Sequence, residues 1–171
     1  FPGNKVHHVP VKKEGKNIAW VYGISYPQKE VTENLALKFK NEKKEGFSIG
    51  LLHTNVGQQP GHDNYAPCSI NDLVSRNFDY WALGHIHEYK VLRESEPAIV
   101  YSGNTQARHS REAGQKGCCL VTLSTDHPPD IRFMSTDVVA YRSATVDLQA
   151  AQSINDVLRS IQVQCEELAK E

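Results

Sequence analysis

The sequence predicts an α+β fold. Several runs of β-branched and aromatic residues have the length of strands, and turn residues separate the later runs at hairpin-like spacing. A segment near the end of the chain has the apolar spacing of an amphipathic helix. With 171 residues, 39% of them hydrophobic, the chain can form one domain, or one domain and part of a second.

The first half of the chain reads as strand, helix, strand and loop. A strand is predicted at 18–26, and a helix from Thr32, its N-cap, to about Lys44. The run 47–53 (FSIGLLH) is almost continuously apolar, which is typical of a strand covered on both faces. The segment 54–67 is rich in Asn, Gly, Gln and Pro, and it predicts a surface loop of the kind that carries function.

The second half adds strands and two capped helices. Ser-x-x-Asp sequences beginning at Ser69 and Ser153 predict capping boxes, the first for a short helix and the second for an amphipathic one. Strands are predicted at 80–83, 88–93, 98–102, 117–123 and 131–134. The pattern changes after these strands, so we expect residues 1–136 to form one domain and residues 137–171 to begin another.

The composition argues against several classes of protein. The 19 Lys and Arg residues balance 20 Asp and Glu residues, unlike a purely electrostatic nucleic-acid binder. No apolar run approaches the roughly 18 residues of a membrane span. The four cysteines form no CxxC pair and the first residues lack a secretory pattern, so we expect a soluble, cytoplasmic protein. The chain begins at Phe1 and its only methionine is Met134, so we expect a part of a longer protein.

Three histidines lie at the ends of predicted strands. His53 ends the run 47–53, and Gly84-His85-Ile86-His87 follows the strand at 80–83. Side chains alternate along an extended segment, so we expect His85 and His87 to face the same side. Imidazoles in such a group suit zinc, manganese, iron or nickel, although ordinary half-buried histidines are the alternative.

A dinuclear phosphoryl-transfer site would also need carboxylate ligands. The carboxylates near the histidines in the sequence are Asp63, Asp79 and Glu88, and none has a convincing metal-ligand spacing. The acidic half of such a site is therefore missing from this chain.

Five motifs follow one another along the chain: LLHTNV, GHDNYAP, FDYWALGHIH, IVYSGNTQARHSRE and KGCCLVTL. Together they resemble the C-terminal half of the catalytic domain of calcineurin-like metallophosphoesterases, over residues 18–134. Within that family they are similar to the bacterial DNA-repair exonucleases of the SbcD and YhaO type. The resemblance implies part of a four-layer αββα sandwich, with a β-α capping domain beginning near residue 137.

The resemblance implies a hydrolase that cleaves DNA phosphodiester bonds with two divalent metal ions, usually Mn²⁺. Its metal ligands map to His53, His85 and His87, and each histidine of the GHxH motif binds one of the two metals. The remaining ligands and the catalytic histidine of the family lie in N-terminal motifs that do not occur in this sequence. We therefore expect this chain alone to be inactive.

Other residues match loops that border the active site of the family. His62 and the group Asn104, Arg108 and Arg111 are candidates for contact with DNA or a phosphate, and solvated loop residues are the alternative. A coiled-coil ATPase partner is implied by analogy. Self-association is expected if the sheet face is left uncovered.

Three other functions remain open. One is another phosphoesterase of the same superfamily, such as a phosphomonoesterase or a cyclic-nucleotide phosphodiesterase. The second is a metal-binding or interaction module without catalysis, such as a cupin-like barrel. The positions of Glu88 and Glu94 count against a cupin, which carries a further Glu a few residues after its HxH pair. The third is an isolated fragment that folds and has no activity of its own.

Overall fold

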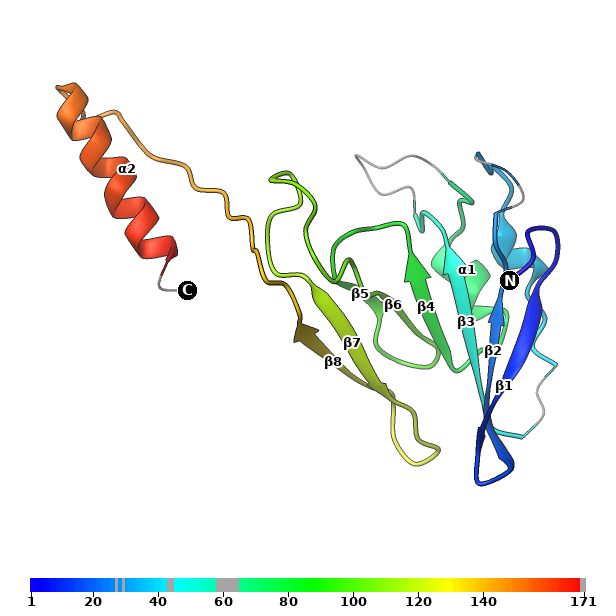
Figure 1. The fold of residues 1–171 in the computed structure, drawn as a ribbon. Coiled ribbons are helices and arrows are strands. Elements are labelled where there is room, and N and C mark those ends of the chain that lie inside the picture. Colours follow the sequence, from blue (N-terminus) through cyan, green and yellow to red (C-terminus); the bar gives the residue numbers. More distant parts are fainter. Residues whose placement is uncertain (27, 29, 43–44, 58–64, 170–171) are drawn as a thin grey trace.

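A six-stranded mixed sheet forms the centre of the structure (Figure 1). The computed structural model describes residues 1–26, 28, 30–42, 45–57 and 65–169. In spatial order the strands are β1 (His7–Lys13), β2 (Lys16–Gly23), β3 (Phe47–His53), β4 (Tyr80–Gly84), β6 (Ala98–Tyr101) and β5 (Lys90–Arg93). The four inner strands are parallel, and the outer strands β1 and β5 are antiparallel to their neighbours. The carboxyl ends of β3 and β4 therefore lie at the same edge of the sheet.

The two faces of this sheet are covered by different layers. Alternate residues of β6 belong to different apolar clusters, because successive side chains of a strand point to opposite faces. On one face, η1 (Leu35–Lys38) and α1 (Ile70–Val74) contribute to a cluster with Trp81 at its centre. On the other face pack β7 (Gly117–Thr122) and β8 (Asp130–Ser135), which form a two-stranded antiparallel sheet.

The resulting order of layers is helices, large sheet, small sheet. The α+β fold class predicted from the sequence is therefore confirmed, and the layers are consistent with part of a four-layer sandwich. The ring of Tyr89 stacks on that of Phe133, with centroids 4.7 Å apart, and this contact helps to join the two sheets.

The C-terminal helix α2 (Ile154–Leu168) lies apart from both sheets at the end of an extended segment (Figure 1). Both predicted capping boxes are present, Ser69 with Asp72 and Ser153 with Asp156. None of the described residues Ile154–Leu168 is buried. The boundary after residue 136 remains a prediction. Among the described residues, no helix is long and apolar enough to cross a membrane.

The helix predicted from Thr32 to Lys44 is wrong. Among the described residues 32–42 only one 3₁₀ turn forms, η1, and Asn34 rather than Thr32 is its N-cap. Leu35 and Phe39 are buried, but the chain has no apolar residue from there until Phe47. A longer helix would have had no apolar face to bury, and burial of such a face stabilises most short helices.

Two further features of the structure were not predicted. The polar stretch 1–17 contains β1, an edge strand that tolerates Pro10 because it pairs on one side only. The predicted surface loop 54–67 begins with the fully buried residues Thr54–Val56, and its residues 58–64 lie outside the described part of the chain. The hydroxyl of Thr54 donates to the carbonyl of Ala66, so the base of this loop belongs to the core.

Candidate metal centre

The sheet register brings His53 and His85 together. β3 and β4 are parallel neighbours, and the last residue of β3, His53, pairs with the last residue of β4, Gly84. His85 follows immediately. Gly84 makes room for the ring of His53, because a Cβ atom at this glycine would lie 3.0 Å from His53 Nδ1.

The two rings present nitrogen atoms to each other. His53 Nε2 and His85 Nδ1 are 3.3 Å apart, and the ring planes meet at 73°. Two imidazole nitrogens bound to one tetrahedral metal at about 2.0–2.1 Å would be separated by roughly 3.3–3.4 Å. The separation of these two atoms therefore fits a shared divalent ion.

The electrostatic surroundings keep His53 in the form that binds metals. Burial lowers the pKa of His53, and the neighbouring His85 and His87 lower it further. The imidazole is consequently neutral at neutral pH, as a metal ligand must be.

The backbone at His85 is strained. Its φ is +105°, a conformation that residues with a Cβ atom rarely adopt and that often marks functional sites. β4 ends at Gly84, so strand alternation does not continue through His85 and His87. The prediction that His85 and His87 face the same side assumed an extended segment, and this assumption was wrong. His85 contacts His53, whereas His87 contacts Glu112.

Two tyrosines border the histidine pair. The hydroxyl of Tyr26 donates to the carbonyl oxygen of His53 at 2.8 Å, and its ring lies edge-on to the His53 ring. Burial raises the pKa of Tyr26 to about 12, so this donor keeps its proton. The ring of Tyr65 lies edge-on to the ring of His85 at 5.7 Å. These contacts restrain both imidazoles.

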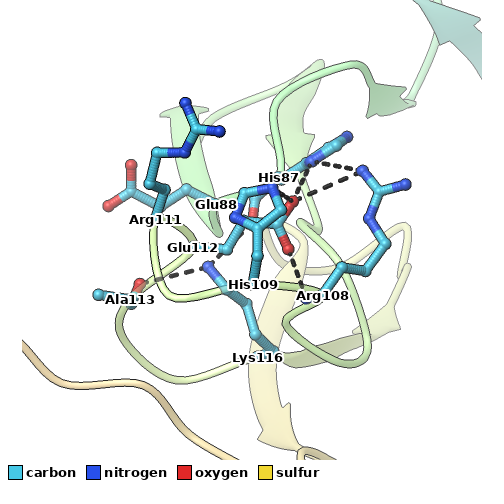
Figure 2. Close-up of a pocket in the computed structure, with 8 residues that line it drawn as sticks. All are labelled: His87, Glu88, Arg108, His109, Arg111, Glu112, Ala113 and Lys116. Carbon is cyan, nitrogen blue, oxygen red and sulfur yellow. Dashed lines mark hydrogen bonds and ion pairs between the residues drawn. The ribbon is translucent and has the colours of Figure 1, made fainter.

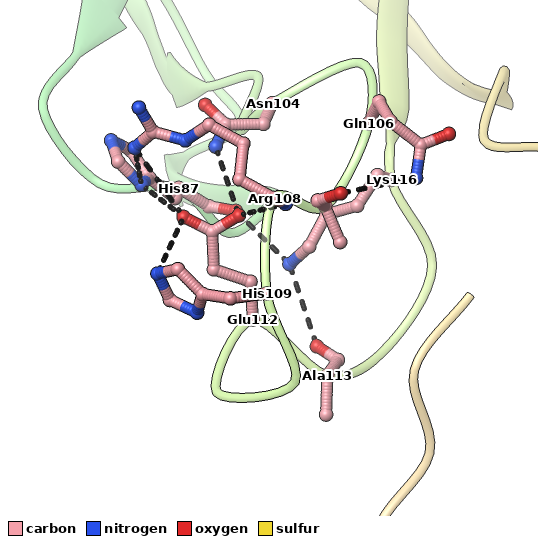
Figure 3. A network of polar contacts seen from close by, with 9 residues as sticks. His87, Asn104, Gln106, Arg108, His109, Glu112, Ala113 and Lys116 are labelled. Carbon is pink, nitrogen blue, oxygen red and sulfur yellow. Dashed lines mark hydrogen bonds and ion pairs between the residues drawn. The ribbon is translucent and has the colours of Figure 1, made fainter. Parts of the chain in front are cut away.

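His87 belongs to a separate network on the loop that follows β6 (Figure 3). Its Nδ1 is 2.7 Å from Glu112 Oε1 and 3.2 Å from a guanidinium nitrogen of Arg108. The buried ammonium of Lys116 donates to the carbonyl oxygen of His87 at 3.1 Å. The backbone and the ring of His87 are thus both held by this loop.

An open pocket of about 600 Å³ lies beside His87 (Figure 2). Three basic side chains and two carboxylates line it, together with two histidines and an alanine: Arg108, Arg111, Lys116, Glu88, Glu112, His87, His109 and Ala113. The Arg108 side chain is 67% exposed, so its guanidinium is accessible from solvent. Guanidinium groups suit bidentate contacts with phosphate.

The other candidate residues have different positions. Asn104 turns its amide toward Glu112, with Nδ2 3.5 Å from Oε2. Arg111 lines the pocket on the side of the loop away from Arg108 (Figure 2). His62 lies outside the described residues. The structure therefore brings Asn104, Arg108 and His87 into one network and leaves Arg111 at its margin.

In the described part of the chain, neither Asp79 nor Glu88 joins the histidines in a cluster that could hold a metal. Across the described ranges, no three His, Cys, Asp or Glu side chains converge on a common metal position. Asp79 immediately precedes β4, and its carboxylate accepts from the backbone and hydroxyl of Ser48. Asp63 lies outside the described residues.

Sequence reasoning missed Glu112, Lys116 and Tyr26. Glu112 is the last residue of the motif IVYSGNTQARHSRE, in which the arginines and not the carboxylate were predicted to contact a phosphate. No sequence signal connects Glu112 with His87, because 25 residues separate them and the loop conformation alone brings them together.

The chain is similar to metallophosphoesterases. It is 39% identical over 150 residues to the uncharacterized metallophosphoesterase YhaO of Bacillus subtilis, covering 88% of this chain and 36% of that protein. It is also similar to two proteins named DNA double-strand break repair protein Mre11. The identity is 24% for that of Methanocaldococcus jannaschii, over 84% of this chain and 40% of the relative. The identity to the Mre11 protein of Sulfurisphaera tokodaii is 29%, over 69% of this chain and 32% of that relative.

The chain thus spans between about a third and two fifths of the length of these curated relatives. No family model matches it. The similarities are thus to a protein named as a metallophosphoesterase and to proteins named for the repair of DNA double-strand breaks.

Proposed function

We propose that this chain is the C-terminal part of the catalytic domain of a DNA exonuclease that hydrolyses phosphodiester bonds in DNA repair. The observation that carries the proposal is the His53–His85 pair, whose nitrogens are 3.3 Å apart at the carboxyl ends of parallel strands. The relatives named Mre11 support DNA as the substrate.

In this proposal the histidines hold two divalent ions, of which Mn²⁺ is the expected metal. His53 and His85 share one ion, and His87, which has different contacts, serves the other. Such ions lower the pKa of bound water and stabilise charge on phosphorus. The remaining ligands come from outside this chain, so the chain by itself is inactive.

The side chains around the site have supporting roles. The accessible guanidinium of Arg108 binds a phosphate of the DNA backbone, and Arg111 contributes positive charge at the rim of the same pocket. Tyr26 and Tyr65 restrain the rings that carry the first metal. Asn104 stabilises the loop through Glu112, and His62 belongs to the proposed substrate loop.

The wider proposal includes location and partners. The protein acts in the cytoplasm and cooperates with a coiled-coil ATPase, and its exposed apolar surfaces permit self-association. Co-purification of an ATPase with the tagged protein, followed by cell fractionation, tests both statements.

A nuclease assay tests the function. The longest natural protein that contains this chain is incubated with Mn²⁺ and linear double-stranded DNA, and in parallel with small phosphate monoesters. Release of nucleotides is expected from the longer protein but not from the chain alone. Each of His53→Ala, His85→Ala and His87→Ala should lower the rate at least a hundredfold or so, since lost ligands cost more than lost outer partners.

His127→Ala is the matched control. His127 is an exposed histidine in the turn between β7 and β8, and its ring contacts only the following carbonyl among the hydrogen bonds described. This variant should keep full activity. Turnover of monoesters without DNA cleavage would contradict the nuclease assignment and favour another phosphoesterase.

A further inference from the structure

Glu112 is a shielded carboxylate directed at His87. Its side chain is 8% exposed, and Oε1 lies 2.7 Å from His87 Nδ1. The other oxygen, Oε2, accepts from the backbone N–H of Arg108 at 2.8 Å. The Arg108 guanidinium is 3.5 Å from Oε1. Both oxygens of this carboxylate are therefore engaged within the network, one with the His87 ring and one with the backbone of Arg108.

The contact between Glu112 Oε1 and His87 Nδ1 determines which ring nitrogen of His87 carries hydrogen. A carboxylate can only accept hydrogen bonds, so Nδ1 must be the donor in the 2.7 Å contact. The Arg108 guanidinium, 3.2 Å from Nδ1, is also a donor and cannot share a hydrogen bond with a protonated Nδ1. The Arg108 guanidinium therefore pairs with the carboxylate of Glu112. In the neutral ring, the free electron pair then lies on Nε2.

We propose that Glu112 is a positioning residue for His87, which fixes its Nδ1–H tautomer and directs Nε2 toward a divalent metal ion. This inference rests on the proposed function, because it assumes that His87 is a metal ligand. Metal-bound histidines usually donate their second N–H to a carboxylate or carbonyl, which orients the ring and raises its basicity. Glu112 supplies such an acceptor for His87.

The loop gives Glu112 a fixed position. Glu112 N donates to the carbonyl of His109, and Lys116 joins the same loop to the backbone of His87. The carboxylate and the imidazole thus belong to two segments that are tied together at backbone level (Figure 3). Rotation of the His87 ring would break the shortest contact in this network.

The test measures the tautomer before any metal is added. Long-range ¹H–¹⁵N spectra of the longest natural protein that contains this chain report which ring nitrogen of His87 is protonated, with His87→Gln as the assignment variant. The wild-type ring should be protonated on Nδ1. In Glu112→Ala it should shift toward Nε2–H, and Glu112→Gln should give a mixture, since its amide can donate or accept.

The second readout is metal affinity. Titration with Mn²⁺ should show one of two sites weakened about tenfold to a hundredfold in Glu112→Ala, the range for loss of an outer carboxylate partner. Glu94→Gln, an exposed carboxylate in the turn after β5, is the charge-matched control and should change neither readout. If Glu112→Ala unfolds the loop, Glu112→Gln replaces it in both measurements.

The two proposals fail in different ways. An Nε2–H tautomer in the wild type, or an unchanged tautomer and affinity in a folded Glu112 variant, would overturn the role of Glu112. Absence of Mn²⁺ binding to the wild type would instead overturn the proposed function, and with it the metal that this role requires.

Discussion

The smallest feature on which the site depends is the missing side chain of Gly84. A Cβ atom there would lie 3.0 Å from His53 Nδ1, which is tighter than ordinary van der Waals contact. The His53 ring would have to move by a few tenths of an ångström. His53 Nε2 would then lose its alignment with His85 Nδ1, although the strands could remain paired.

Gly84→Ala should therefore weaken metal binding without unfolding the protein. We expect Mn²⁺ affinity at the His53–His85 site to fall about tenfold, comparable to loss of an outer partner of a metal ligand. Chelator competition measures the affinity, and a thermal melt of the same variant is the control. Unchanged affinity would show that the ring position seen here does not matter for binding.

Gly50 offers a contrast within β3. A Cβ atom at Gly50 would lie 2.4 Å from the ring of Trp81, which is fully buried at the centre of the helix-covered face. Trp81 also donates from its indole N–H to the carbonyl of Leu73, so the ring has little freedom to shift.

Gly50→Ala should destabilise the protein by about 1–3 kcal/mol, the usual cost of overpacking a core. Urea unfolding followed by tryptophan fluorescence measures this loss. Gly84→Ala should lower stability less, because the His53 ring that it would meet lies outside the apolar core clusters. A Gly50→Ala protein as stable as the wild type would mean that the indole can move, contrary to its packing here.

At the scale of elements, Asp72 couples two short helices. Its carboxylate accepts from the backbone and hydroxyl of Ser69, closing the capping box of α1, and from the amide of Asn34, the N-cap of η1. The hydrogen bonds from Ser69 are the main cause of the lowered pKa of Asp72.

Asp72→Asn should destabilise the fold by about 1 kcal/mol at neutral pH, the typical value of a helix cap. The pKa is lowered in the folded state, so this stabilisation is present above the ordinary value of 3.8 and is lost as the pH falls through the lower folded value. The difference between variant and wild type should accordingly shrink in acid. Urea midpoints measured at several pH values check this.

Asp156→Asn removes the same box from α2 and is the matched control. Because none of the described residues Ile154–Leu168 is buried, global unfolding should be nearly unchanged. Equal losses of stability in both variants would contradict the coupling described for Asp72.

Much of this arrangement follows from local sequence patterns. The capping boxes, the strand β3 and the strand-end positions of His53 and His85 were predicted, because each depends on residues close in sequence. The helix predicted after Thr32 was wrong, because it lacked an apolar face to bury. The strand β1 was not predicted, because it gains its pairing from β2. The contact between Glu112 and His87 could not be predicted, because it depends on the conformation of the loop.

At the scale of the whole molecule, apolar surface is left uncovered. Leu120 and Met134 are 55% and 50% exposed on the small sheet. On α2, the side chains of Ile154, Leu158 and Ile161 form an apolar face that is 43–70% exposed. Surfaces of this kind favour association between proteins.

Leu158→Glu should therefore reduce self-association of the chain. Burial of one leucine contributes about 1.5–3 kcal/mol, so its replacement should weaken a dimer at least about tenfold. Sedimentation at several concentrations measures this change. Gln162→Glu, which adds the same charge on the same helix, is the control. A wild-type chain that is monomeric at all concentrations would contradict the prediction.

The most direct test of the metal centre is the position of bound Mn²⁺ in a crystal of the longest natural protein that contains this chain. Anomalous scattering should give one peak between His53 Nε2 and His85 Nδ1, and a second beside His87 Nε2. Peaks that do not touch these three nitrogens, in crystals of active protein, would contradict the account.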